Sequence, residues 1–437
     1  NNLGMHLAGV QRTAKALDVA EEAVRLYRNL TARDPHVFSP DLAGALHNLG
    51  THRAELGHLT AAFYATEEAV RIRTRLAVSK RVVFEAGLAA SLHNLATNCA
   101  ELGYGDRALS HVQNAIDHYE RLHFAAPEIY APELAVCLHN QGVQLARAGR
   151  LKEAAAATRR GVEIRANITT AVLSRYEEQL ATAMQQLGVR LPGPLPLDDE
   201  SSPDPAVSVL QRSVNDIVRS MDPGSVQSTG NLEIRLARAA RLTAVITSAS
   251  PHAAGQLALG RRELARAERQ FATTLSSLSS RLVDIGKASE ALATSEQAVS
   301  TCRRLVAVDP VLYRPDLVSC LANHGLRLAE FGRRDHALKA TEYAVTLLGW
   351  PSDIDLESST AMTASALQAF AWVRLKASLE LESASDAMEQ AHAIYLRLAE
   401  DEPSAFGGAA VAAKRTHDGV LALMGDQDPP PSTDEPD

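Results

Sequence analysis

Apolar residues recur along this chain at helical spacing, and the helical pattern itself repeats every 46 residues. Stretches beginning at Leu42, Leu88 and Leu134 read LAGALHNLGTHRAELG, LAASLHNLATNCAELG and LAVCLHNQGVQLARAG. A weaker copy begins at Leu180, and two clear copies begin at Phe271 and Leu317. In the first of these copies Leu42, Leu46 and Leu49 follow the i, i+4, i+7 pattern of one helix face. Self-similarity at a fixed period in this range predicts a solenoid of stacked helical pairs.

Glycines and prolines punctuate the repeat. Gly57 and Gly103 follow the first helix, at the place where a glycine commonly ends a helix. A second helix then runs to a segment with the spacing Pro-x2-[Phe/Tyr]-x-Pro, which begins at Pro35, Pro127 and Pro310. The first proline would end one helix, and the second would fit the first turn of the next. We therefore expect a helix, a tight turn, a longer second helix and a proline-marked loop.

The copies divide the chain into four segments. Residues 1–190 hold four repeats, of which the first begins partway into its helix, so we expect more protein upstream of residue 1. Residues 271–424 hold three repeats and a terminal helix, and residues 425–437 form an acidic, proline-rich tail that we expect to be disordered. Residues 191–270 admit two interpretations. They hold either two degenerate repeats, with residues 191–205 as a proline-rich insert, or a linker between two arrays; we favour the degenerate repeats.

Composition narrows the class of protein. The chain is 46% hydrophobic but only 4% aromatic, which suits close-packed helices better than sheets. A net charge of −8 argues against a general nucleic-acid binder. Seven arginines cluster between residues 235 and 269, but Glu233, Glu263 and Glu268 accompany them, which favours an exposed helix face of mixed charge over a nucleic-acid patch. No apolar run approaches the roughly 18 residues that span a membrane, and no signal segment opens the chain. The four cysteines form no CxxC pair, so we expect buried thiols and a cytoplasmic location.

The core of the repeat, Leu46, Leu49-Gly50, Gly57, Ala62 and Ala69, resembles the tetratricopeptide repeat. The resemblance implies an all-α fold, a right-handed α-α superhelical solenoid of helix pairs, that works in protein–protein interaction. The period exceeds the usual 34 residues of that family. It looks like the longer repeats of kinesin-light-chain-like proteins and of actinobacterial signalling arrays. The family's large aromatics are replaced by Arg53 and Thr66, for which alanine-rich packing would compensate.

Polar residues that repeat with the period are the candidate ligand contacts. In tetratricopeptide arrays the first helices line a concave groove, where an asparagine binds the main chain of an extended peptide. One amide both donates and accepts, so it can hold a backbone without reading side chains. A structural role, in which these side chains tie neighbouring helices together, is the alternative. The suspected peptide-binding residues are Asn2, His47, Asn48, His93, Asn94, His139, Asn140 and Asn323.

The sequence argues against metal binding, a dicarboxylate clamp and enzymatic activity. Histidines in adjacent repeats would lie at least roughly 8–10 Å apart, whereas zinc needs each nitrogen about 2 Å away, so we expect no metal and no cofactor. No Lys or Arg accompanies the asparagines, which argues against a dicarboxylate clamp for a chaperone C-terminus. No nucleotide-binding, metalloprotease or nucleophile-elbow motif occurs, and we expect no enzymatic activity.

Two functional hypotheses remain. The first is a scaffold that binds a protein or peptide segment, with neither a nucleic acid nor a membrane as partner. The second is the sensor or regulatory arm of a larger signalling protein, with a nucleotide-binding or protease-like effector domain upstream. Reading the gene upstream of residue 1 distinguishes them, because an open frame that encodes a P-loop would favour the second.

Overall fold

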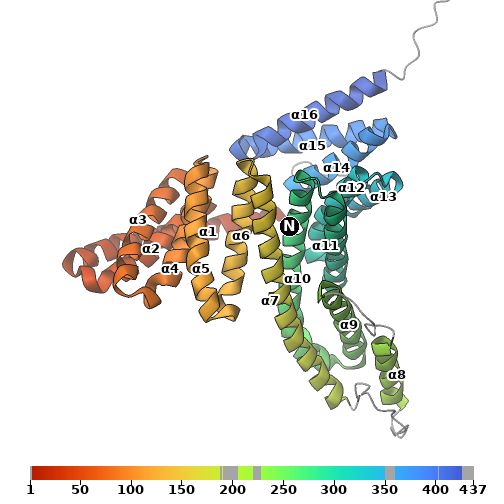
Figure 1. Cartoon of the computed structure of the whole chain (residues 1–437), viewed down its shortest axis with the longest axis horizontal. Coiled ribbons are helices and arrows are strands. Elements are labelled where there is room, and N and C mark those ends of the chain that lie inside the picture. Colours follow the sequence, from red (N-terminus) through yellow and green to blue (C-terminus); the bar gives the residue numbers. More distant parts are fainter. Residues whose placement is uncertain are drawn as a thin grey trace, which may run out of the picture. The chain divides into compact units, whose positions relative to one another are not determined.

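The computed structural model of the chain (Figure 1) describes residues 2–187, 189, 205–219, 228–349, 360–401 and 403–425. For residues 2–14, 205–208, 218–219, 228–231, 401, 403–405 and 425 it describes the backbone alone. These residues form sixteen helices and no strand, which confirms the expected all-α class. The helices are α1 (Asn2–Arg33), α2 (Pro35–Glu55), α3 (Leu59–Ser79), α4 (Arg81–Glu101), α5 (Gly105–Ala125), α6 (Pro127–Arg147), α7 (Leu151–Gln186), α8 (Pro205–Arg219), α9 (Ser228–Ala249), α10 (Pro251–Asp284), α11 (Ala288–Val308), α12 (Pro310–Glu330), α13 (Arg334–Leu348), α14 (Ala361–Ala377), α15 (Leu381–Asp401) and α16 (Pro403–Gly425).

The chain divides into two compact bodies, an N-terminal body, Asn1–Ile168, and a C-terminal body, Thr169–Asp437. The boundary falls inside α7. In each body, helices that follow one another in sequence pack against each other as hairpins (Figure 1). Helices two apart also touch, as α2 does with α4 and α10 with α12. Each body is therefore a run of helical hairpins in sequence order.

In the N-terminal body the 46-residue period corresponds to two helices of equal length. The helices α2 to α6 each have 21 residues. Residues 56–58 form the turn within a repeat, and Lys80 alone joins α3 to α4. In the C-terminal body α11 and α12 also have 21 residues each. The expected longer second helix is therefore wrong, because both helices of a repeat are extended.

The expected proline-marked loop is also wrong, because its prolines belong to the next helix. Pro35 is the first residue of α2, and Pro40 lies inside that helix. Asp34 is the N-cap: its Oδ1 accepts hydrogen bonds from the backbone N–H groups of His36 (3.1 Å) and Val37 (3.2 Å). Asp309 caps α12 in the same way. A capping carboxylate followed by a proline, whose φ is already helical, starts a helix after a single non-helical residue.

The turn glycines are confirmed. Gly57 has φ 75°, and the N–H of His58 donates to the carbonyl of Arg53 while that of Gly57 donates to Ala54. This is the Schellman pattern, in which a left-handed residue closes the helix. The same bonds and a positive φ occur at Gly103, Gly149, Gly286 and Gly332. Ser378, with φ 52°, takes the equivalent place after α14.

Three helices are continuous at positions where the 46-residue period predicts a break. In α1 the missing break is the turn within a repeat, and in α7 and α10 it is the connection between two repeats. The helices α1, α7 and α10 have 32, 36 and 34 residues. In α1, Gln11 stands where the turn glycine would be. In α7 and α10 the equivalents of Lys80 are Val172 and Glu263, with neither an Asp cap nor a proline beside them. In α7 and α10 the second helix of one repeat continues into the first helix of the next. Lys80 also lacks both signals and still ends α3, so their absence alone does not account for the continuity.

Small residues allow the two helices of a repeat to approach closely. Ala62, Ala69, Ala108 and Ala115 are fully buried, as the alanine-rich pattern predicts. Thr66 is also fully buried and packs against Gly50. A Cβ at Gly50 would overlap the Thr66 hydroxyl and lie 3.3 Å from the Ala62 carbonyl oxygen. The same glycine–threonine contact recurs at Gly142–Thr158 and Gly325–Thr341.

Parts of the predicted organisation remain untested. Residues 191–204 and 426–437, which include most of the expected insert and the acidic tail, lie outside the described residues. Helices α8 and α9 and the first part of α10 occupy the expected degenerate segment. Continuation of the repeat through that segment stays a prediction. Among the described residues, no helix is long and apolar enough to cross a membrane.

Candidate peptide-binding surface

The repeated histidines and asparagines lie on the first helix of each repeat. His47 and Asn48 are on α2, His93 and Asn94 on α4, His139 and Asn140 on α6, and Asn323 on α12. All are half-buried except Asn48, which is exposed. Asn2 lies in α1, but its side chain is outside those described. The fold thus places the predicted residues at equivalent positions on successive first helices.

Three of the asparagines connect consecutive first helices. The Nδ2 of Asn94 donates to the Thr51 hydroxyl at 3.0 Å. The Nδ2 of Asn140 lies 2.8 Å from the His93 Nε2, and that of Asn323 donates to the Ser276 hydroxyl at 2.7 Å. Each bond reaches back to the first helix of the preceding repeat. These contacts support the structural role, while peptide binding by the same amides stays a prediction.

Two histidines of this surface, His47 and His93, favour their neutral form. Burial, with the positive charges of Arg73 and His93, lowers the pKa of His47 to about 4. Burial also lowers the pKa of His93. Neutral His93 can accept the Asn140 N–H through its Nε2, and neutral His47 can accept from the Ser91 hydroxyl, 3.1 Å from its Nδ1. His47 and His93 are therefore neutral members of the polar network between α2, α4 and α6.

Each body has a hollow at these first helices. A hollow of about 140 Å³ in the N-terminal body lies between α4, α5 and α6. Its lining residues are Ala96, Thr97, Ala100, Glu101, Val112, Asn140, Val143, Gln144 and Arg147. A hollow of about 300 Å³ in the C-terminal body lies between α10, α11 and α12. Its lining residues are Thr273, Ser276, Ser277, Ser280, Arg281, Cys302, Asp316, Ser319, Cys320 and Asn323. Asn140 and Asn323, which hold the same place in their repeats, both face an open hollow.

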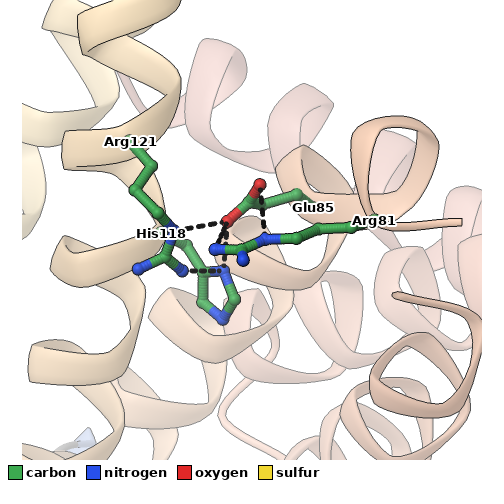
Figure 2. Close-up of polar contacts among 4 residues, drawn as sticks. All are labelled: Arg81, Glu85, His118 and Arg121. Atoms are coloured by element: carbon green, nitrogen blue, oxygen red, sulfur yellow. Dashed lines mark hydrogen bonds and ion pairs between the residues drawn. The ribbon is translucent and has the colours of Figure 1, made fainter. Parts of the chain in front are cut away.

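A buried carboxylate that the sequence analysis missed lies where α4 begins, beside α5 (Figure 2). Glu85 is 7% exposed and accepts hydrogen bonds from Arg81 (3.1 Å) and Arg121 (2.8 Å), with the His118 Nδ1 at 2.9 Å. Burial alone would raise the pKa of Glu85, but the bonds from Arg81, His118 and Arg121 outweigh it and lower the pKa to about 2. A carboxylate held by so many donors is suited to joining helices, not to accepting a proton.

The same pairing recurs in the C-terminal body. Glu268 is 6% exposed and accepts a hydrogen bond from the Arg304 Nε at 3.0 Å. Glu85 and Arg121, like Glu268 and Arg304, are 36 residues apart and occupy the same positions of the repeat. That shared spacing is the signal in the sequence that could have revealed the pair. Among the described residues, no group of three or more His, Cys, Asp or Glu side chains is arranged to hold a metal ion.

No protein-family model and no curated protein matches the sequence. Among the solved structures that match the chain are three at 12% identity each. The P58(IPK) TPR domain covers 86% of this chain and 99% of its own, with a TM-score of 0.17. Yeast Tom70 covers 88% and 99% with a TM-score of 0.19, and a circular tandem repeat protein covers 95% and 98% with 0.20. TM-scores this low carry no argument about this chain. Its own hairpins, turn glycines and 46-residue period show an all-helical protein built from repeated helical hairpins.

Proposed function

We propose that this chain is a protein-interaction scaffold that binds an extended peptide or protein segment along its first helices. The observation that carries the proposal is the equivalent placement of Asn140 and Asn323 beside open hollows in the two bodies. The ligand would lie across α4 and α6 in the N-terminal body. A second contact site of the same kind would lie across α10 and α12 in the C-terminal body.

The chemistry of the hollows fits a peptide main chain. An amide side chain has two N–H donors and a carbonyl acceptor, and the helix-joining bond of Asn140 uses one donor. The remaining N–H and the carbonyl suit a peptide C=O and N–H. Ala96, Ala100 and Val143 supply an apolar floor for a ligand side chain. Glu101 and Arg147 at the same hollow offer both signs of charge, so the surface does not select for strongly charged ligands.

The repeat geometry also sets a spacing for the ligand. Packed helices lie about 8–10 Å apart, so equivalent asparagines are separated by at least that distance. An extended peptide advances about 3.3 Å per residue. Successive asparagines would therefore contact peptide groups at least about three residues apart, and a ligand that reaches two of them needs a segment of several residues.

The test uses the full chain and a phage-displayed library of random peptides. Peptides selected on the wild-type protein are measured against Asn94→Ala/Asn140→Ala by isothermal titration. Each lost hydrogen bond costs about 1 kcal/mol, so the double variant should bind roughly 10-fold or more weakly. Selected peptides that bind the double variant as tightly as the wild type would refute the proposal.

A matched variant separates binding from folding. Asn114→Ala makes the same change at an exposed position on α5, the second helix of a repeat, and should leave the affinity unchanged. Asn94 and Asn140 also connect helices, so circular dichroism must show that the double variant is folded at the temperature of the titration. Equal loss of affinity in the α5 variant would indicate a general effect, not contact with the ligand.

A further inference from the structure

Two buried thiols face each other where one repeat meets the next. Cys302 on α11 and Cys320 on α12 are both free, and their Sγ atoms are 3.1 Å apart. Helix α11 is the second helix of one repeat, and α12 is the first helix of the following one. Only Asp309 separates the two helices in the chain. The thiol pair therefore spans the joint between consecutive repeats.

The same two positions are filled by other pairs in the N-terminal body. At the joint between α3 and α4 the pair is Arg73 and Ser91, again 18 residues apart, and the Arg73 guanidinium donates to the Ser91 hydroxyl at 2.6 Å. At the joint between α5 and α6 the pair is Tyr119 and Cys137, both buried. Each pair is part of a joint between repeats. Among these three pairs, only Cys302 with Cys320 can be joined covalently.

The thiol pair has a path to solvent. Both cysteines line the hollow of about 300 Å³ in the C-terminal body, beside Ser319 and Asn323. Cys320 is 5% exposed, whereas Cys302 is fully buried. The hydrogen bond with Cys320, together with burial, raises the pKa of the Cys302 thiol. Cys320 is therefore the sulfur that is accessible to a small oxidant, and Cys302 is the buried thiol that can react with it afterwards.

We propose that Cys302 and Cys320 form a reversible disulfide that locks the joint between α11 and α12. The Sγ atoms must approach from 3.1 Å to about 2.0 Å, a movement of the order of one ångström. The proposal does not depend on peptide binding. It assigns a modification site to a place that the other repeats hold by non-covalent contact.

A peroxide is the oxidant class that fits the hollow. The Cys320 thiolate attacks hydrogen peroxide: the S–O bond of a sulfenic acid forms, the O–O bond breaks, and the leaving hydroxide takes a proton as water. The Cys302 sulfur then attacks the Cys320 sulfur. The S–S bond forms, the S–O bond breaks, and hydroxide leaves with the Cys302 proton as a second water. The two thiols lose two electrons together, and the peroxide is reduced to water.

The experiment counts thiols in the full chain. The protein is treated with hydrogen peroxide, freed of oxidant, denatured and alkylated with N-ethylmaleimide before intact-mass measurement. The untreated chain should take four alkyl groups, one for each cysteine, and the oxidised chain two. A peptide map should show a cross-link between residues 302 and 320. The melting temperature of the C-terminal body should rise by several degrees and fall back after dithiothreitol.

A matched cysteine elsewhere in the chain supplies the control. Cys137 holds the position of Cys320 in its repeat and is fully buried, but it faces Tyr119. Cys137→Ser should leave the cross-link intact, whereas Cys302→Ser and Cys320→Ser should each abolish it. Four alkylated thiols in the oxidised wild type, or a map that pairs other cysteines, would overturn the proposal. The wild-type map decides the question even if a serine variant fails to fold.

Discussion

Glu85 and Glu268 are buried glutamates that face an arginine of the neighbouring helix. Both are less than 8% exposed, and both sit three positions before the first leucine or phenylalanine of their repeat. Taking a carboxylate out of water is costly unless donors replace the lost hydration. In the N-terminal body Arg81, His118 and Arg121 provide those donors (Figure 2). Loss of the carboxylate would leave these donors close together without their acceptor.

We expect Glu85→Ala to lower the free energy of unfolding of the N-terminal body by about 2 kcal/mol. Breaking a fully buried ion pair costs about 3–5 kcal/mol, but Arg81 and Arg121 are 56% and 45% exposed and can partly rehydrate. Glu67→Ala is the matched control, because Glu67 also pairs with an arginine, Arg107, while 46% exposed. It should cost less than about 1 kcal/mol. Urea unfolding, monitored by hydrogen exchange of the α4 and α5 amides, measures the free-energy change for each variant. Equal changes in Glu85→Ala and Glu67→Ala would contradict the stabilising role of Glu85.

The imidazoles of the first-helix surface predict a loss of stability in mild acid. His47 has a folded-state pKa of about 4, below its ordinary value of 6.5, so between these pH values the unfolded chain binds a proton that the folded chain does not. His93 is shifted in the same direction. Stability should therefore be complete above pH 6.5 and decline as the pH falls towards 4. Glu85, with a folded pKa of about 2, reduces stability only below its ordinary value of 4.5.

Hydrogen exchange of α2 and α4 amides at pH values from 7 to 4.5 checks this decline. His47→Gln keeps a polar side chain beside Ser91 but cannot take up a proton. It should reduce the loss of stability between pH 6.5 and 4.5 by roughly 2 kcal/mol, because the unfolded imidazole is half protonated at pH 6.5 and almost fully protonated at pH 4.5. A decline as steep in the variant as in the wild type would show that other groups bind the protons.

At the scale of helices, some boundaries follow from the sequence and others do not. The turn glycines could be predicted because a positive φ at a fixed position favours one residue type, as at Gly57. The start of α2 was misread because Pro35 and Pro40 suit either a loop or a helix start. The cap bonds of Asp34 decide between these, and they depend on side-chain geometry. The continuity of α7 and α10 could not be predicted, because the spacing of apolar residues is the same whether the helix is continuous or broken.

The glycine–threonine contacts give a prediction about how two helices approach. Gly142→Ala would place a methyl group against the Thr158 hydroxyl and 3.2 Å from the Ala154 carbonyl oxygen. We expect it to destabilise the N-terminal body by about 1–3 kcal/mol, as overpacking of a core does. Removing the opposing group in Gly142→Ala/Thr158→Ala should restore part of that loss. Thermal unfolding by circular dichroism is the measurement.

Gly44 is the control for this substitution. It lies inside α2, and a Cβ there would meet nothing within 4 Å. Alanine has the higher helix propensity, so Gly44→Ala should stabilise the protein by up to about 1 kcal/mol. Two changes of the same chemistry should thus have opposite signs. If both variants are stabilised, α6 and α7 do not approach as closely as the Gly142–Thr158 contact requires.

At the scale of the whole molecule, the 46-residue period was enough to predict most of the helical-repeat fold, but few of the contacts in the candidate site. Equivalent positions such as Asn94 and Asn140 could be found by counting. Their hydrogen-bond partners could not, because Thr51 and His93 lie 43 and 47 residues earlier and the offset depends on how the helices are stacked. The second helices use different chemistry. The bridges Arg28–Glu68, Arg107–Glu67 and Arg160–Glu120 join consecutive ones, each across 40 residues.

The single residue that joins one repeat to the next has a consequence for how such a gene can change. Because Lys80 is the whole connection between α3 and α4, one repeat ends there and the first helix of the next repeat begins directly. Unequal recombination that adds or removes 46 codons would connect the end of a second helix to the start of a first helix, as Lys80 already does. The number of repeats can therefore change by whole repeats without a new kind of connection between helices.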